Sequence, residues 1–160
     1  LRPFVVESDG QQVRVYGTEF NVRSYADGDA TRTTLVQGSI ALAPTHSGGG
    51  ELMLTPGQQA VLDGGKASLR SVNTDVVTSW RQGRFVFEDQ TLEQIMADLA
   101  RWYDFRYEFR DDATRHIVFV GSIPRYAKFE TALSILAATG NISYEIAQAD
   151  GATTICFAHK

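Results

Sequence analysis

The hydrophobic pattern of this 160-residue chain changes at about residue 80. Before that point, short segments in which apolar and polar residues alternate are separated by glycine and proline, and no segment carries a helical period. After it, two stretches repeat their apolar residues every three or four positions, which is typical of amphipathic helices, and strand-like runs flank them. The change predicts two parts, an all-β domain over residues 1–78 and an α+β domain over residues 79–160.

Turn signals recur in the first half at intervals of about 8–12 residues, the spacing of an all-β layered structure. Within the strands, alternation places side chains such as Phe20 and Val22 on one face. We therefore expect a twisted antiparallel sheet or a sandwich. The expected strands are residues 4–6, 12–16, 19–25, 31–36, 39–42, 52–54, 59–62 and 67–70.

Two helices are expected in the second half, separated and followed by strands. Thr91 and Gln94 have the spacing of a capping box, which predicts the start of the first helix. A second helix is expected from about Lys128, and Gly140 suits a left-handed stop at its end. The apolar residues of the first helix are expected to form one buried stripe, made of Leu92, Ile95, Met96, Leu99 and Trp102.

The second half also contains an internal similarity at an offset of 37 residues. With this offset Leu99 aligns with Leu136, and Tyr107 aligns with Tyr144. The similarity predicts two βαβ units packed together, with both helices on one side of the sheets. Chance similarity between two amphipathic helix–strand pairs is the alternative explanation.

Four segments in order carry a family resemblance. Residues 13–22 read Val-Arg-Val-Tyr-Gly-Thr-Glu-Phe-Asn-Val, residues 36–40 Val-Gln-Gly-Ser-Ile, residues 54–59 Leu-Thr-Pro-Gly-Gln-Gln, and residues 80–87 Trp-Arg-Gln-Gly-Arg-Phe-Val-Phe. Together they resemble the motifs of FecR-type sigma-factor regulators. The second half, with Gly-Ser-Ile-Pro at residues 121–124, resembles the secretin-and-TonB N-terminal (STN) fold that ends such regulators.

The resemblance implies a periplasmic region cut from a single-pass protein of the inner membrane. A cytoplasmic segment outside this chain would bind an extracytoplasmic-function sigma factor. The periplasmic region would sense the N-terminal signalling domain of an outer-membrane TonB-dependent transducer. Periplasmic and intramembrane proteases would then release the sigma factor and switch on genes for iron or siderophore uptake.

Five residues are expected to matter for interactions. Trp80 is interpreted as an aromatic anchor where the two halves meet. The loop with Arg125 and Tyr126 is a candidate contact because Arg and Tyr are frequent interface anchors, and Arg106 and Glu108 lie on the polar face of a nearby strand. The alternative is that Tyr126 only staples a helix and Arg125 is solvated.

Composition and motif content argue against other functions. The net charge of -4 and the pI of about 5.3 lack the basic footprint of a duplex nucleic-acid binder. No nucleophile elbow, phosphate loop or metal-ligand spacing occurs, so we expect no enzyme, cofactor or metal. A glycan- or peptidoglycan-binding module is the second hypothesis, because Tyr16, Phe20 and Tyr25 could stack on sugar rings if they shared an exposed flat face.

Overall fold

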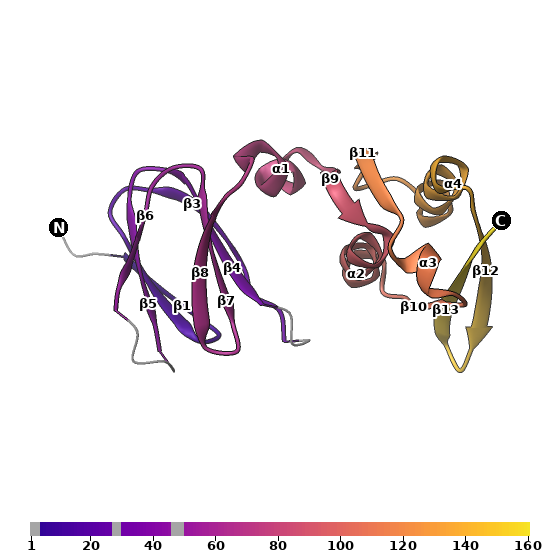
Figure 1. Cartoon of the computed structure of the whole chain (residues 1–160), viewed down its shortest axis with the longest axis horizontal. Coiled ribbons are helices and arrows are strands. Elements are labelled where there is room, and N and C mark those ends of the chain that lie inside the picture. The colour runs from indigo at the N-terminus through magenta and orange to yellow at the C-terminus, as the bar shows by residue number, and fades with distance from the viewer. Residues whose placement is uncertain (1–3, 27–29, 46–49) are drawn as a thin grey trace. The chain divides into compact units, whose positions relative to one another are not determined.

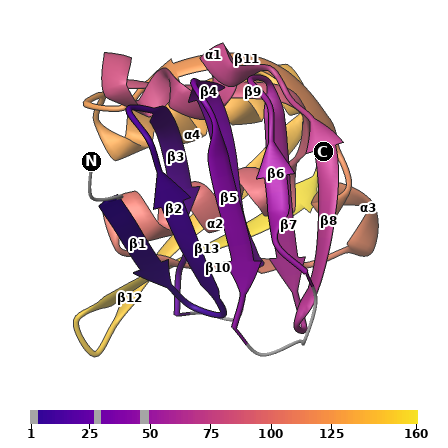
Figure 2. The ribbon, with the colours of Figure 1, turned by 90° about the vertical axis from the view of Figure 1, so that its left-hand side faces the viewer.

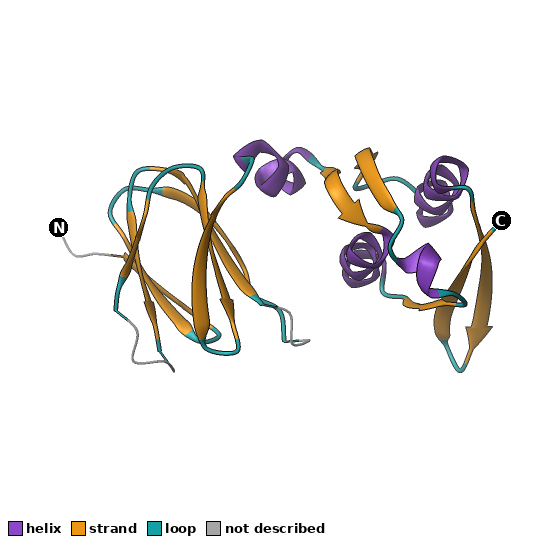
Figure 3. Cartoon of the chain, viewed as in Figure 1, coloured by secondary structure: helices purple, strands orange, loops and turns teal. Residues whose placement is uncertain are grey.

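The computed structural model describes residues 4–26, 30–45 and 50–160. The chain divides into two compact units, Leu1–Thr78 and Ser79–Lys160. The first unit is built of strands with one short helix at its end, and the second combines strands with helices (Figure 1, Figure 3). The expected fold class, mainly β followed by α+β, is confirmed.

The first unit contains two four-stranded antiparallel sheets, in the orders β1-β2-β5-β6 and β3-β4-β7-β8 (Figure 2). The chain leaves the first sheet after β2 and enters the second at β3. Gly17, at a φ of +67°, allows this change of direction, since a positive φ favours glycine. The strands are β1 (Phe4–Ser8), β2 (Gln11–Val15), β3 (Glu19–Arg23), β4 (Thr31–Gln37), β5 (Ile40–Pro44), β6 (Leu52–Leu54), β7 (Gln58–Asp63) and β8 (Lys66–Ser71).

The core of the first unit is formed by both sheets. Val13 and Leu42 from one sheet and Leu35 from the other are fully buried in one cluster, and Phe20 packs against it as the alternation predicts. The first unit also buries polar side chains, among which the Gln11 side-chain amide donates to the Thr33 hydroxyl at 2.7 Å. Buried amides and hydroxyls of this kind need such partners inside a protein.

A short helix, α1 (Thr74–Thr78), ends the first unit and contacts β4. It was not expected, since the first half carries no helical period. Five residues make little more than one turn, so a helix of this length cannot display a repeating apolar face. Its first turn is fixed locally, because the Asn73 side chain accepts the backbone N–H of Asp75 at 3.1 Å.

The second unit places its two long helices between two sheets. One sheet pairs β9 with β11, and the other has the order β10-β13-β12. Helix α2 contacts β9 and β10, and helix α4 contacts β11 and β12, so each helix touches both sheets. The elements are a 3-10 helix η1 (Ser79–Gln82), β9 (Arg84–Thr91), α2 (Leu92–Tyr103), β10 (Arg106–Phe109), α3 (Asp112–Arg115), β11 (Val118–Pro124), α4 (Phe129–Gly140), β12 (Ile142–Ala149) and β13 (Ala152–His159).

The internal similarity of the sequence corresponds to a repeat in the structure. Helices α2 and α4 each have 12 residues. Each ends at a left-handed residue, Asp104 after α2 and Asn141 after α4. The two strands of each βαβ unit do not pair with each other: the first strands form one sheet, and the second strands join β13 in the other.

One detail of the helix ends differs from expectation. Gly140 was expected to be the left-handed stop, but that role falls to Asn141, with a φ of 50°. Gly140 is required by packing instead, since a Cβ there would lie 2.5 Å from the ring carbon Cζ of Phe119. The short helix α3 is capped by Asp111, whose carboxylate accepts the backbone N–H of Thr114 at 2.7 Å.

Trp102 is not part of the buried stripe of α2, so that prediction was wrong. Leu92, Ile95, Met96 and Leu99 are all 0% exposed, whereas Trp102 is 41% exposed. The stripe continues four residues beyond Leu99, at Tyr103, which packs against the core. Trp102 lies one position to the side, at the edge of the buried face.

None of the helices in the described parts of the chain has the length and apolar content needed to span a bilayer.

Candidate functional site

The second unit gathers exposed aromatic rings around one arginine. The guanidinium carbon of Arg125 lies 3.8 Å from the ring centre of Trp102, 5.4 Å from that of Phe85 and 5.9 Å from that of Trp80. The ring of Tyr126 meets Trp102 edge-on at 6.0 Å. We call these five residues, Trp80, Phe85, Trp102, Arg125 and Tyr126, the aromatic cluster.

The aromatic cluster is a surface feature and not part of the core. Trp80 is 49% exposed, Trp102 is 41% exposed and Tyr126 is 80% exposed, while Phe85 and Arg125 are half-buried. Single exposed apolar residues are common on proteins, but a contiguous group marks an interaction site more often. A cation over an aromatic face contributes about 0.5–2 kcal/mol, so Arg125 holds the rings in a defined arrangement.

Backbone hydrogen bonds fix the loop that carries Arg125. Its N–H donates to the carbonyl of Gly83 at 2.7 Å, and its carbonyl accepts the indole N–H of Trp102 at 2.9 Å. The hydroxyl of Tyr103 lies 3.2 Å from the same carbonyl and 2.9 Å from that of Ala127. Burial raises the pKa of Tyr103, so this hydroxyl keeps its proton to donate.

Gly83 makes room for the exposed tyrosine. It has a φ of +69°, and a Cβ there would lie 2.9 Å from Cε2 of Tyr126. Glycine is therefore favoured at this position by its backbone conformation, and a larger residue would also displace the Tyr126 ring. The Trp-x-x-Gly segment thus contributes the Trp80 ring to the aromatic cluster, and its Gly83 lies against the Tyr126 ring.

The structure brings together three of the five residues expected to matter. Trp80, Arg125 and Tyr126 all belong to the aromatic cluster. The guanidinium of Arg125 stacks on the Trp102 ring, so the alternative of a solvated Arg125 side chain does not hold. The role of Trp80 as an anchor between the halves stays a prediction. Sequence reasoning missed Trp102 and Phe85 as site residues. The spacing of Trp102 fits the apolar stripe of a helix, and Phe85 fits the pattern of a strand, so neither stood out as a surface residue.

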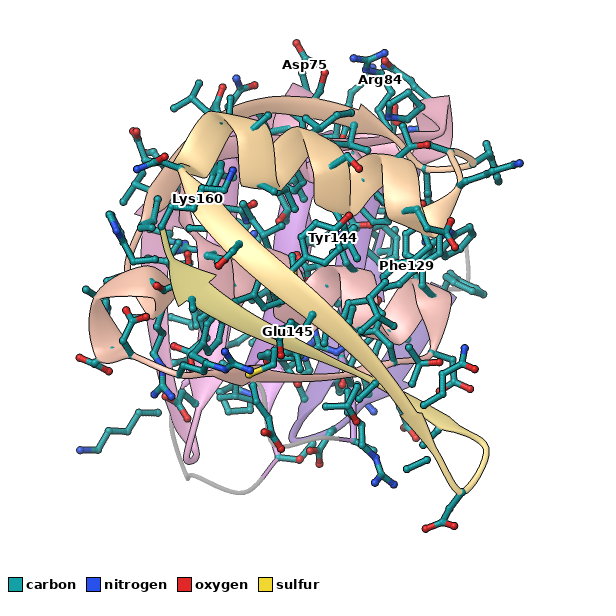
Figure 4. The ribbon with its side chains drawn as sticks, turned by 90° about the vertical axis from the view of Figure 1, so that its right-hand side faces the viewer. Asp75, Arg84, Phe129, Tyr144, Glu145 and Lys160 are labelled. Atoms are coloured by element: carbon teal, nitrogen blue, oxygen red, sulfur yellow. The ribbon has the colours of Figure 1, made fainter. Side chains whose placement is uncertain are left out.

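Arg106 and Glu108 lie on a second surface, the outer face of the three-stranded sheet. Both are exposed on β10, an outer strand of that sheet. On the same face Arg110 forms an ion pair with Glu145. Glu145 lies on β12, the opposite outer strand (Figure 4). Within the described parts of the chain, neither Arg106 nor Glu108 has an ion-pair partner.

A shallow groove of about 490 Å³ runs beside β10. Its wall is formed by Glu93 from α2 and Arg115 from α3, whose Oε1 and Nε atoms are 3.7 Å apart. The guanidinium of Arg115 also lies 5.5 Å from the ring centre of Phe109. The groove is lined by Glu93, Tyr107, Glu108, Phe109 and Arg115.

The aromatic residues considered for glycan binding do not share a platform. Tyr16 follows β2 of one sheet and Tyr25 follows β3 of the other, while Phe20 packs against the core. Among the residues with described positions, no three His, Cys, Asp or Glu side chains are grouped as a metal ion would require.

The chain is similar to a known protein family and to solved structures. Residues 84–154 match the family model for FecR, C-terminal. Two crystal structures of a candidate anti-sigma factor from Parabacteroides distasonis have a similar fold, with TM-scores of 0.77 and 0.76. In both cases the identity is 20%, and the alignment covers 99% of this chain and 72% of the other. A search of curated proteins found no match. The family match confirms the resemblance to FecR-type regulators over residues 84–154, and the aromatic cluster lies largely within that range.

Proposed function

We propose that this chain, whose C-terminal unit is of the FecR type, is the signal-sensing region of a membrane-anchored sigma-factor regulator. Its task is to bind another protein in the periplasm, and the aromatic cluster is the centre of the binding surface. The single observation that carries this assignment is the set of three exposed rings, Trp80, Trp102 and Tyr126, held around Arg125. The family match to residues 84–154 supports the regulatory role.

The chemistry of the aromatic cluster suits protein recognition. Trp, Tyr and Arg are the residue types that carry most binding energy in interfaces. The arginine is already stacked and its loop already hydrogen-bonded, so binding would order few additional groups. Such preorganisation lowers the entropic cost of association.

The partner that fits best is the N-terminal signalling domain of an outer-membrane TonB-dependent transducer of siderophores. The C-terminal unit would be an STN-like domain, and the transducer's signalling domain is expected to be of the same small βαβ kind. Binding would lead to cleavage by periplasmic and intramembrane proteases. A segment outside this chain would then release an extracytoplasmic-function sigma factor.

The experiment is a calorimetric titration of the purified chain with the signalling domains of transducers from the same genome. At least one domain is expected to bind, and the double variant Arg125→Ala/Tyr126→Ala is expected to weaken that binding by about 10- to 100-fold. Tyr16→Ala is the matched control, since it removes a tyrosine of the first unit that is 59% exposed. Equal dissociation constants for the double variant and the wild type would contradict the role of the cluster.

A further inference from the structure

We infer that the free edge of β10 pairs with an extended segment of the partner, one in which an acidic and a basic residue flank an apolar residue. This inference rests on the proposed function, because the segment belongs to the protein that binds the aromatic cluster. It adds a second contact, made by backbone pairing at the edge of a sheet.

The edge of β10 is accessible in the fold. Among the strands that the structure describes, β10 pairs with β13 alone. The N–H of Arg110 donates to the carbonyl of Phe157 at 2.9 Å, across to β13. Because N–H groups alternate in direction along a strand, that of Phe109 points away from β13 and toward the groove.

The other strand edges of this unit are less suited to pairing. The β9–β11 pairing is irregular between Phe119 and Gly121, and such bulges blunt a sheet edge. Facing that irregularity, Asp89 of β9 has a φ of 52°. On β12, the other outer strand of the larger sheet, Glu145 already forms an ion pair with Arg110. Its charge is therefore not available to select a partner strand. The groove, by contrast, runs beside β10.

The charges on β10 specify the segment. Arg106 and Glu108 point to the same outer face, since they are two positions apart on a strand. Residues directly opposite on an added strand would meet them, and opposite charges stabilise such cross-strand pairs. The segment would therefore place an acidic residue beside Arg106 and a basic residue beside Glu108.

The residue between these two charges would point into the groove. There it would meet the rings of Tyr107 and Phe109, which are half-buried on the inner face of β10. Aromatic ring surface favours an apolar side chain at this position. The Glu93–Arg115 pair on the opposite wall limits how far the side chain can extend.

Amide hydrogen exchange measured by NMR tests the pairing directly. The probe is the transducer signalling domain that binds in calorimetry, titrated into the labelled chain. The amide of Phe109 is expected to exchange at least tenfold more slowly in the complex, while amides of β11 and β12 keep their rates. Slowing at β11 or β12 without slowing at Phe109 would overturn the inference and leave the proposed function standing. If no signalling domain binds, both are overturned.

A pair of charge variants tests whether the partner segment places a basic residue beside Glu108. Glu108→Gln is expected to weaken binding about two- to fivefold, the size of an exposed cross-strand charge pair. Ala147→Lys is the matched control, because it raises the charge of the same sheet by the same amount on β12 and should leave the affinity unchanged. Circular dichroism checks that both variants fold. Equal affinities for Glu108→Gln and wild type would overturn the specification, and so would an equal loss in both variants.

Discussion

Both units bury a hydrophobic core, but they use their surfaces differently. In the first unit the exposed apolar residues are distributed over several strands, among them Phe4, Met53 and Leu69. In the second unit three exposed aromatic rings surround one arginine. The grouping of exposed aromatic residues is therefore a better guide to a binding surface than their number, and among the described residues such a group occurs in the second unit.

The first and largest test asks whether the two units are stable independently. Leu99→Ala in α2 should lower the free energy of unfolding of the second unit by about 2–5 kcal/mol, because the side chain is 0% exposed. Both tryptophans of the chain, Trp80 and Trp102, lie in this unit, so tryptophan fluorescence during urea unfolding reports it selectively.

The matched variant for this test is Leu35→Ala in the first unit, also 0% exposed. It should shift the circular dichroism transition but not the fluorescence transition. Equal shifts of the fluorescence transition in both variants would mean that the units unfold as one.

The second test concerns close packing in the second unit. Gly140→Ala should destabilise it by about 1–3 kcal/mol, since the new Cβ would lie 2.5 Å from the Phe119 ring. Asn141→Gly is the control, because glycine readily adopts the left-handed conformation and should leave stability within about 1 kcal/mol. Stabilisation by Gly140→Ala, as helix propensity alone would give, would contradict the packing explanation.

The third test compares two cation–π contacts. Arg125→Ala should lower the stability of the second unit by about 0.5–2 kcal/mol and change the emission of Trp102, whose ring centre is 3.8 Å away. Arg23→Ala in the first unit should cost less, since its guanidinium lies 5.5 Å from Tyr25. Thermal unfolding of both variants provides the comparison, and a larger loss for Arg23→Ala would reverse the ranking.

The smallest effect is expected from pH. Hydrogen bonds from the Thr114 hydroxyl, the Thr114 N–H and the His159 N–H hold the pKa of Asp111 below its usual 3.8. The ionised carboxylate therefore stabilises the folded state above pH 3.8, and this contribution is lost as pH falls through the lower folded pKa. The stability difference between wild type and Asp111→Asn should shrink on acidification. A difference that is independent of pH would show that the charge of Asp111 does not contribute.

The sequence predicted most of the fold because most of the fold is encoded locally. Alternating residues located the strands of the first unit, and the capping box at Thr91 located the start of α2. The offset of 37 residues identified the two helices as equivalent. In contrast, the interlocking of the two βαβ units depends on pairing between distant strands, which no local pattern records.

The candidate site was predicted in part. Arg125, Tyr126 and Trp80 were recognised by residue type, which is a property of single positions. Trp102 was assigned to the core because helical spacing cannot tell the edge of a buried face from its middle. What places it in the aromatic cluster is the carbonyl of Arg125, which accepts its indole N–H from a loop 23 residues away.

The strand β13 has a consequence for how the second unit is made. It is the middle strand of its sheet and the last element of the unit, and it pairs Thr154 with Arg106. A ribosome therefore delivers the two flanking strands before their shared neighbour exists. The second unit cannot close its larger sheet during synthesis until residues beyond 150 have emerged, whereas every strand of the first unit is complete by Ser71.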